Sequence, residues 1–172
     1  GMTFVILIAG IDLSVGSVLA LTGAIAASMV SIELPIFLVV PVVLLIGTLL
    51  GGVSGVIVAK GKVQAFIASL VTMTLLRGIT MVYTDGRPIT TGFSDNADIF
   101  AGIGTGYFLG IPVPIWIMSS VFAVAWYILK HTPIGRYIYA LGGNEAATQL
   151  SGINVNKIKV FVFAVSGFLS AL

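Results

Sequence analysis

One short stretch places polar side chains inside an otherwise apolar run. In AGIDLSVGS, residues 9–17, Asp12 and Ser14 stand between Gly10 and Gly16. The glycines give the backbone the freedom to leave a helix, and the oxygens can accept hydrogen bonds from the unpaired amides that begin the next one. A carboxylate in apolar surroundings is costly, so it is also a candidate functional group in a transport path. Capping is the favoured role because it accounts for both polar residues.

The composition is that of a membrane protein. Of the 172 residues, 58% are hydrophobic and 8% are charged, whereas about a quarter of the residues in a soluble domain are charged. The net charge is only +2 and the basic residues are scattered, which argues against nucleic-acid binding. The chain has no cysteine and one histidine, His131, so no metal site is expected. We see no nucleophile–base set and expect no enzyme.

Five segments are apolar enough to cross the ~30 Å hydrocarbon core in whole or in part. They are Met2–Val30, Pro35–Ala59, Val63–Tyr83, Val113–Leu129 and Val160–Leu172. The sequence therefore predicts an all-α fold, a polytopic transmembrane helical bundle with about five spans. The first segment allows two interpretations. Either the chain turns at the inner side near Ala9 and climbs back out, or a single segment is interrupted at membrane depth.

The charges of the connections predict the orientation. Six of the eight basic residues fall in two connections on one side, at Lys60, Lys62, Lys130, Arg136, Lys157 and Lys159. Cytoplasmic loops collect Lys and Arg, so this side, with the long connection 130–159, is expected to face the cytoplasm. The connection 84–112 is then expected to be a periplasmic loop. Its length indicates a functional role.

Small residues recur at every fourth position in two spans. Gly47, Gly51, Gly55 and Ala59 form one stripe, and the other is formed by Gly16, Ala20, Ala24 and Ser28. Such stripes let helix backbones approach closely in lipid. Packing within one chain is the favoured interpretation, and dimerisation of two subunits is the alternative.

The third span carries a mildly polar face. Ser69, Thr72 and Thr80 share this face, with Arg77 at its border. The hydroxyls either line a water-filled path or bond to neighbouring helices. Arg77 is close enough to the outer end to reach the interface, and it is the best candidate in the sequence for an ionic partner of Asp12.

The inner connection contains a short helix with clear boundaries. Asn144 is a strong N-cap, Glu145 suits the positive end of the helix dipole, and Gly152 is placed to end the helix. Its apolar side chains are Ala146, Ala147 and Leu150. So short a helix is marginal alone, and its apolar face is too sparse for a membrane surface. Docking into a groove on a cytoplasmic partner is the favoured interpretation.

Two stretches, GIDLSVGSVLALTGAIAA and LGGNEAATQLSGINVNKIK, resemble the permease subunits of bacterial ABC importers for monosaccharides of the ribose and xylose type. The resemblance extends over essentially all 172 residues. It implies that 1–172 is part of a single transmembrane permease domain, an internal fragment without the family's first span and C-terminal half. It further implies a multi-pass protein of the bacterial inner membrane, surrounded by lipid and paired with a second permease subunit as a homodimer.

The resemblance also implies partners and site residues. A periplasmic sugar-binding protein delivers the substrate, and a cytoplasmic ATP-binding subunit holds ATP and Mg²⁺, so this chain needs no cofactor. The segment Asn144–Gly152 matches the helix that couples the ATPase to the spans, although its spacing departs from the EAA-x3-G pattern of other importer classes. We expect the outer connection to help dock the binding protein through its charged residues, Asp85, Arg87, Asp95 and Asp98.

Two rival functions use the same residues differently. A secondary, ion-coupled transporter with broken helices around Asp12 would need no ATPase. A non-transporting membrane scaffold or receptor subunit is the third hypothesis. The family resemblance favours the ATP-driven importer over both.

The orientation can be tested by labelling in intact cells. A cysteine that replaces Lys60 in the full-length protein should be protected from membrane-impermeant thiol reagents, because positive loops stay in the cytoplasm. A cysteine at Asp98 is the matched control and should be labelled from outside. Labelling at position 60 with protection at position 98 would invert the orientation.

Overall fold

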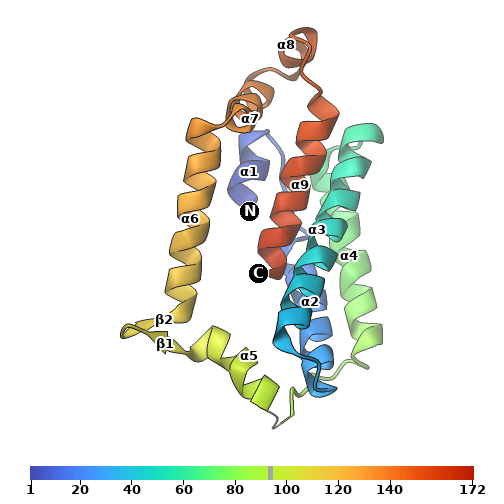
Figure 1. Cartoon of the computed structure of the whole chain (residues 1–172). Helices are drawn as coiled ribbons and strands as arrows, with labels where there is room; N and C mark the ends of the chain where they lie inside the picture. The colour runs from blue at the N-terminus through green and yellow to red at the C-terminus, as the bar shows by residue number, and fades with distance from the viewer. Residues whose placement is uncertain (93–94) are drawn as a thin grey trace.

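The computed structural model describes residues 1–92 and 95–172, and Figure 1 shows most of its helices extended along one common direction. Along the chain the elements are α1 (Met2–Leu7), α2 (Val15–Ser31), α3 (Ile36–Lys60), α4 (Ala65–Tyr83), α5 (Asp95–Thr105), β1 (Tyr107–Phe108), β2 (Ile111–Pro112), α6 (Val113–His131), α7 (Pro133–Gly143), α8 (Glu145–Leu150) and α9 (Val155–Ala171). The expected all-α helical bundle is confirmed. In the described part of the chain, α3, α4 and α6 are long and apolar enough to cross a membrane.

Apart from the first apolar segment, the predicted spans agree with the helices to within five residues. The largest difference is the start of α9, and one helix, α7, was not predicted. α9 begins at Val155, five residues before the expected start, because the Asn154 side chain accepts a hydrogen bond from the Lys157 amide and caps the helix there. The inner connection also contains α7, which the sequence reading did not identify. Thr132 caps it through the Gly135 amide, and Pro133 occupies its first position.

The first apolar segment is broken, and the structure combines both interpretations of the break. α1 ends at Leu7, and Ala9 has a left-handed backbone conformation with a φ of 58°. Residues 8–14 then return along the bundle without helical structure, so that α2 begins well below the inner end (Figure 1). The chain thus reverses at the inner side, as the first interpretation has it. α2 nevertheless begins away from the inner end, inside the bundle, as the second interpretation has it.

The central contact of the bundle joins α3 and α9, the most extensive helix pair in the structure. A Cβ atom on Gly51 would meet the carbonyl oxygen of Phe163 and would lie 2.9 Å from the Gly167 Cα. A Cβ atom on Gly55 would lie 2.8 Å from the Val160 Cα. Backbone-to-backbone approach of this kind is possible only where one side of each helix carries small residues. The α3 stripe therefore packs within the chain, as favoured.

The second small-residue stripe is not used in the same way. Gly16 and Ala20 are exposed, and a Cβ atom on Gly16 would meet nothing within 4 Å. The buried side of α2 is a different one, formed by Ser17, Val18, Leu21, Thr22, Ala26 and Val30. Only one of the two stripes therefore makes a close helix contact inside this chain.

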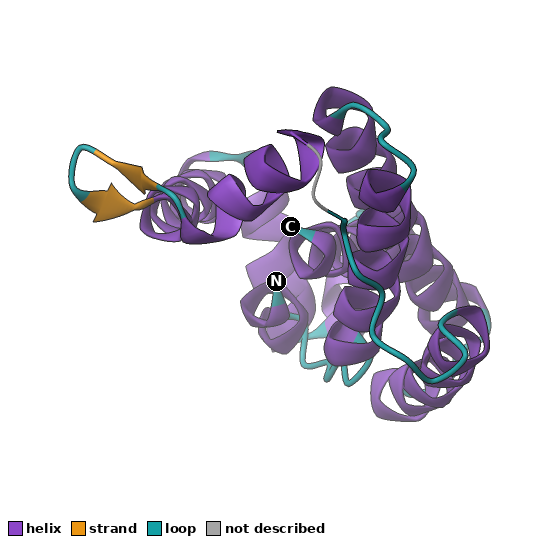
Figure 2. Ribbon diagram, turned by 90° about the horizontal axis from the view of Figure 1, so that it is seen from below, coloured by secondary structure: helices purple, strands orange, loops and turns teal. Residues whose placement is uncertain are grey.

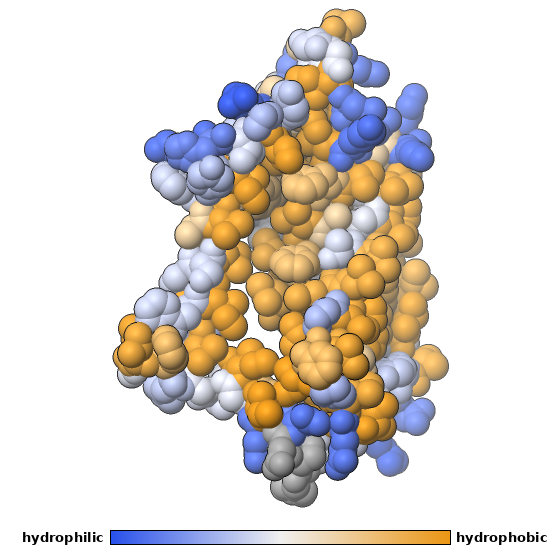
Figure 3. Space-filling view, viewed as in Figure 1, coloured by the Kyte–Doolittle hydropathy of each residue, from blue (hydrophilic) through white to orange (hydrophobic). Residues whose placement is uncertain are grey.

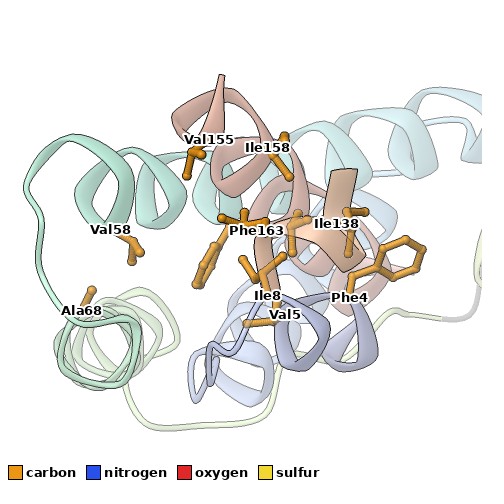
Figure 4. Packing of buried hydrophobic residues seen from close by; sticks show 11 residues of the cluster. Phe4, Val5, Ile8, Val58, Ala68, Ile138, Val155, Ile158 and Phe163 are labelled. Atoms are coloured by element: carbon orange, nitrogen blue, oxygen red, sulfur yellow. The ribbon is translucent and has the colours of Figure 1, made fainter. Parts of the chain in front are cut away.

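The main apolar core lies near the inner end, where five helices meet. Ile138 of α7 and Phe163 of α9 pack with Phe4 and Val5 of α1 and with Ile8, the residue after α1 (Figure 4). Val58, Ala68, Val155 and Ile158 complete the labelled cluster. α1 also abuts α7 through its backbone, since a Cβ atom on Gly142 would meet the Leu7 carbonyl oxygen. The end of α1 is thereby fixed to the inner connection.

Polar residues gather at the two ends of the bundle, and the middle is apolar (Figure 3). The α3–α4 turn, α7 and α8 lie at one end, and the α2–α3 turn and α5 lie at the other (Figure 1). The six basic residues assigned to the cytoplasm belong to elements of the first end. α6 stands apart from the main bundle and has no buried residue, which fits a helix whose surroundings are lipid or further protein.

The connection 84–112 is more structured than the loop expected from the sequence. It contains α5 and a two-stranded antiparallel hairpin in which Tyr107 pairs with Pro112 and Phe108 with Ile111. The turn of the hairpin uses left-handed backbone at Leu109 and Gly110. Seen from below, the hairpin projects from the bundle beside α6 (Figure 2). Strands of two residues are too short to show an alternating pattern, so the hairpin could not be predicted from the sequence.

The glycine contact makes a pair of matched substitutions informative. Gly51→Ala places a methyl group against the α9 backbone and should destabilise the full-length protein by about 1–3 kcal/mol through overpacking. The neighbouring Gly52→Ala is the control, because its Cβ atom would lie 4.0 Å from the nearest atom, the Ala164 Cβ. Thermal unfolding in detergent should separate the two variants. Equal midpoints would contradict the assigned contact.

Candidate functional site

Asp12 is buried, with 4% of its surface exposed, and both its carboxylate oxygens accept hydrogen bonds. Oδ1 accepts from the Ser14 amide at 3.0 Å and from the Ser14 hydroxyl at 2.6 Å. Oδ2 accepts from the Ser166 hydroxyl of α9 at 2.9 Å. Ser14 and Ser166 are themselves 2% and 0% exposed. The carboxylate thus joins the start of α2 to a helix 154 positions later in the chain.

The capping hypothesis is correct in position and wrong in detail. Ser14 is the N-cap residue of α2, and its carbonyl oxygen accepts from the Ser17 and Val18 amides. Its side chain makes no capping hydrogen bond, because the hydroxyl donates to Asp12 instead. Asp12 in turn accepts from the Ser14 amide, which precedes the helix. The carboxylate therefore organises the non-helical segment and does not cap α2 directly.

A second hydroxyl reaches the same segment from α4. Ser69 is fully buried, and its hydroxyl is 3.2 Å from the Ile11 carbonyl oxygen and 3.0 Å from that of Phe66 in its own helix. Thr72, one turn further along, is hydrogen bonded to Ser54 of α3 at 3.3 Å. The polar face of α4 thus bonds to neighbouring elements, which is the second of the two interpretations considered.

Two members of the predicted polar face of α4 behave differently. The Thr80 hydroxyl donates to the Leu76 carbonyl oxygen in its own helix at 2.8 Å. Arg77 is exposed and is not the ionic partner of Asp12, because the carboxylate is occupied by Ser14 and Ser166. Arg77 also lies about two helical turns beyond Ser69, the residue of α4 that is hydrogen bonded to the break.

α8 has the boundaries that the sequence predicted. The Asn144 side chain accepts from the Ala147 amide at 3.0 Å, and Gly152 has a φ of +81°, the left-handed conformation that ends many helices. Glu145 in the first turn pairs with Lys159 of α9, with 2.7 Å between Oε1 and Nζ. This ion pair is the only one among the described side chains, those of residues 1–92 and 96–172. It holds α8 against the inner end of α9.

The apolar side chains of α8 face away from the protein. Ala146 and Ala147 are exposed and Leu150 is 89% exposed, whereas Thr148 is buried on the opposite side. A leucine this exposed at the tip of the inner connection has no packing partner within the described residues. The small apolar face is therefore available to another molecule.

A cavity of about 860 Å³ opens beside α8 at the inner end. Lys60, Lys62 and Lys159 contribute to its lining, together with Glu145 and Gly10. Three basic side chains from different elements thus meet at one end, as expected for a cytoplasmic face. Gly10 brings the turn after α1 to the edge of this cavity.

The outer charged residues belong to two different parts of the connection 84–112. Asp85 and Arg87 are exposed in the turn after α4, where Asp85 has a φ of 51°. Asp98 is exposed on α5. Asp95 begins α5, and its side chain lies outside the described residues. Asp85 and Arg87 therefore lie on a different element from Asp98.

Sequence reasoning missed Ser166, which bonds to Asp12 in the break, and Gly167, one of the residues through which α9 contacts α3. A signal for both exists. Ser166 and Ser170, like Gly167 and Ala171, are four positions apart, which repeats the small-residue spacing recognised in α3. Their partners lie more than 100 positions earlier in the sequence, so the spacing alone does not identify them.

The chain belongs to the family described as branched-chain amino acid transport system / permease component, which it matches over residues 1–172. It is therefore part of a multi-pass protein of the bacterial inner membrane.

The chain is similar to ribose import permease proteins of several bacteria. It is 95% identical to that of Haemophilus influenzae, 64% to that of Escherichia coli K12 and 50% to that of Bacillus subtilis, in each case over all 172 residues. These matches cover 53%, 54% and 53% of the relatives, so the chain spans about half their length. No solved structure matches the chain.

Proposed function

We propose that the full-length protein is the permease subunit of an ATP-driven importer that carries ribose or a related monosaccharide across the bacterial inner membrane. The observation that carries this proposal is the 95% identity to a ribose import permease protein over the whole chain. Ribose is favoured over other sugars because the similarity to an L-arabinose transport permease of Escherichia coli is only 35%. A pair of such subunits forms the path through the membrane.

The inner end supports attachment of a separate ATPase. α8 offers an exposed Leu150 beside two exposed alanines, and its opposite side is fixed by Thr148 and by the Glu145–Lys159 ion pair. A small apolar face on a firmly held helix is suited to a groove on a partner protein. ATP and Mg²⁺ are bound by that partner, and the helix Asn144–Gly152 transmits its movement to the spans.

The buried polar groups support a low-affinity role for this chain toward sugar. Both oxygens of Asp12 are engaged by protein donors, so the carboxylate is not free to hold a sugar hydroxyl. We assign Asp12 and Ser14 to holding the helix break. Selection of the sugar then belongs to a periplasmic binding protein that docks at the outer end.

A reconstitution experiment tests the proposed function. Full-length protein in lipid vesicles with its ATPase and binding protein should hydrolyse ATP faster when ribose is present, because the loaded binding protein triggers the cycle. Omitting the binding protein is the control. Uptake that continues without ATP but requires a proton gradient would favour an ion-coupled transporter and overturn the proposal.

Substitution in α8 tests the attachment site. Leu150→Asp should reduce co-purification of the ATPase at least tenfold, because a charge replaces the apolar side chain at the centre of the proposed contact. Gln149→Asp is the matched control, since it adds the same charge one position away without removing an apolar group. Normal co-purification of the Leu150→Asp variant would exclude α8 as the attachment site.

Charge reversal at the outer end tests docking of the binding protein. Asp98→Lys should reduce uptake when the binding protein is scarce, and uptake should recover when its concentration is raised, because a charge at the rim acts mainly on the association rate. Association with the ATPase should stay unchanged. Uptake equal to that of the unmodified protein at every concentration would contradict this role.

A further inference from the structure

The Asp12 carboxylate links the non-helical segment before α2 to α9. One oxygen holds Ser14 at the start of α2, and the other holds Ser166 in the middle of α9. Both contacts are buried. Hydrogen bonds to a charged group in a low-dielectric interior are strong, so this link is a firm attachment between the two helices.

α9 runs without interruption from the inner connection to this link. Its first residue, Val155, follows α8 after four residues, and Lys159 binds Glu145 of α8 at 2.7 Å. Ser166 lies eleven residues after Val155, which corresponds to about 16 Å of helix. A displacement of α8 therefore reaches Ser166 through a single helix.

The surroundings make α9 a rigid element. Gly167, next to Ser166, packs backbone to backbone against Gly51 of α3, and a Cβ atom on it would meet the Gly47 carbonyl oxygen. Phe163 and Val162 are fully buried on the same helix. Helices packed this closely move as bodies and do not deform gradually.

The segment that contains Asp12, residues 8–14, is less rigid than α9. Residues 8–14 are not helical, and the side chains of Ser17 in α2 and Ser69 in α4 donate hydrogen bonds to their backbone carbonyls. Non-helical backbone lacks the continuous hydrogen-bond ladder of a helix, so it changes conformation at lower cost than the helices around it. We therefore expect the start of α2 to move with α9, the rigid helix to which Asp12 is hydrogen bonded.

We propose that Ser166 and Asp12 are positioning residues for coupling, through which α9 transmits the movement of α8 to the break at the start of α2. This inference rests on the proposed function, because it requires an ATPase that moves α8. It assigns to the buried carboxylate the task of joining the ATP-driven helix to the part of the bundle that changes shape. It assigns no contact with the sugar to either residue.

The test compares two serine substitutions in the same helix. Ser166→Ala removes the donor to Asp12, and Ser170→Ala is the matched control, because its hydroxyl is also buried but donates to the Ser166 carbonyl oxygen of its own helix at 2.7 Å. Full-length variants are reconstituted with the ATPase and the binding protein. Sugar uptake and ATP hydrolysis are measured on the same vesicles, together with the amount of assembled complex.

We expect Ser166→Ala to assemble normally and hydrolyse ATP at the basal rate, with uptake per ATP hydrolysed reduced about tenfold, the factor typical of one lost charged hydrogen bond. Ser170→Ala should keep the normal ratio. Asp12→Asn is the second variant. It keeps an acceptor for Ser14 but removes the charge, so its ratio should lie between those of the two serine variants.

Three results would overturn the link. An unchanged ratio in Ser166→Ala shows that α9 acts by another route. A parallel fall in uptake and hydrolysis, or loss of assembly in Ser166→Ala alone, shows that the residue only supports folding. If the unmodified protein itself shows no ribose-dependent hydrolysis, the proposed function fails, and the coupling role fails with it. The first two outcomes leave the proposed function intact.

Discussion

The close backbone contact between α3 and α9 is the constraint on which the rest of the bundle depends. In lipid, two helices gain little from burying apolar side chains, because the surrounding acyl chains are equally apolar. Their association depends on van der Waals contact, which is greatest where Gly51 and Gly167 let the backbones touch. This contact fixes the depth and rotation of α9. It thereby places Ser166 toward Asp12 and Lys159 toward α8.

The break between α1 and α2 shows how a membrane bundle accommodates non-helical backbone. Freed amides and carbonyls cannot be left unpaired in hydrocarbon, so irregular backbone must be surrounded by protein. Here Asp12 and Ser69 supply the partners from within the bundle. Every buried side-chain nitrogen and oxygen in the described residues has a hydrogen-bond partner. The buried carboxylate is therefore one of the hydrogen-bond partners that the non-helical backbone requires.

The two ends of the protein are built differently, which fits a transport cycle driven from one side. The inner end is compact, because backbone contact at Gly142 joins α1 to α7 and the Glu145–Lys159 ion pair joins α8 to α9. The outer end carries α5 and a projecting hairpin whose residues are largely exposed. A firm inner end can receive force, whereas an exposed outer end can meet a soluble partner.

Much of this architecture could be predicted from the sequence, because the signals are local. Apolar length identified the spans, and Asn144 with Gly152 set the ends of α8. The spacing of Gly47, Gly51 and Gly55 identified a packing face. Each signal lies within one turn or one helix, where neighbouring residues meet whatever the rest of the chain does.

Only the tertiary structure decided which distant groups meet. Arg77 had the right charge to pair with Asp12, yet Ser166, without a charge, is the partner. The pairing depends on the rotation and depth of α9, and these are set by its contact with α3. The break could be predicted from Gly10 and Asp12, but the depth at which α2 begins could not, and Gly16 lies inside α2 rather than in the break. A local pattern specifies where a helix stops, and only packing against other helices specifies what stands opposite that point.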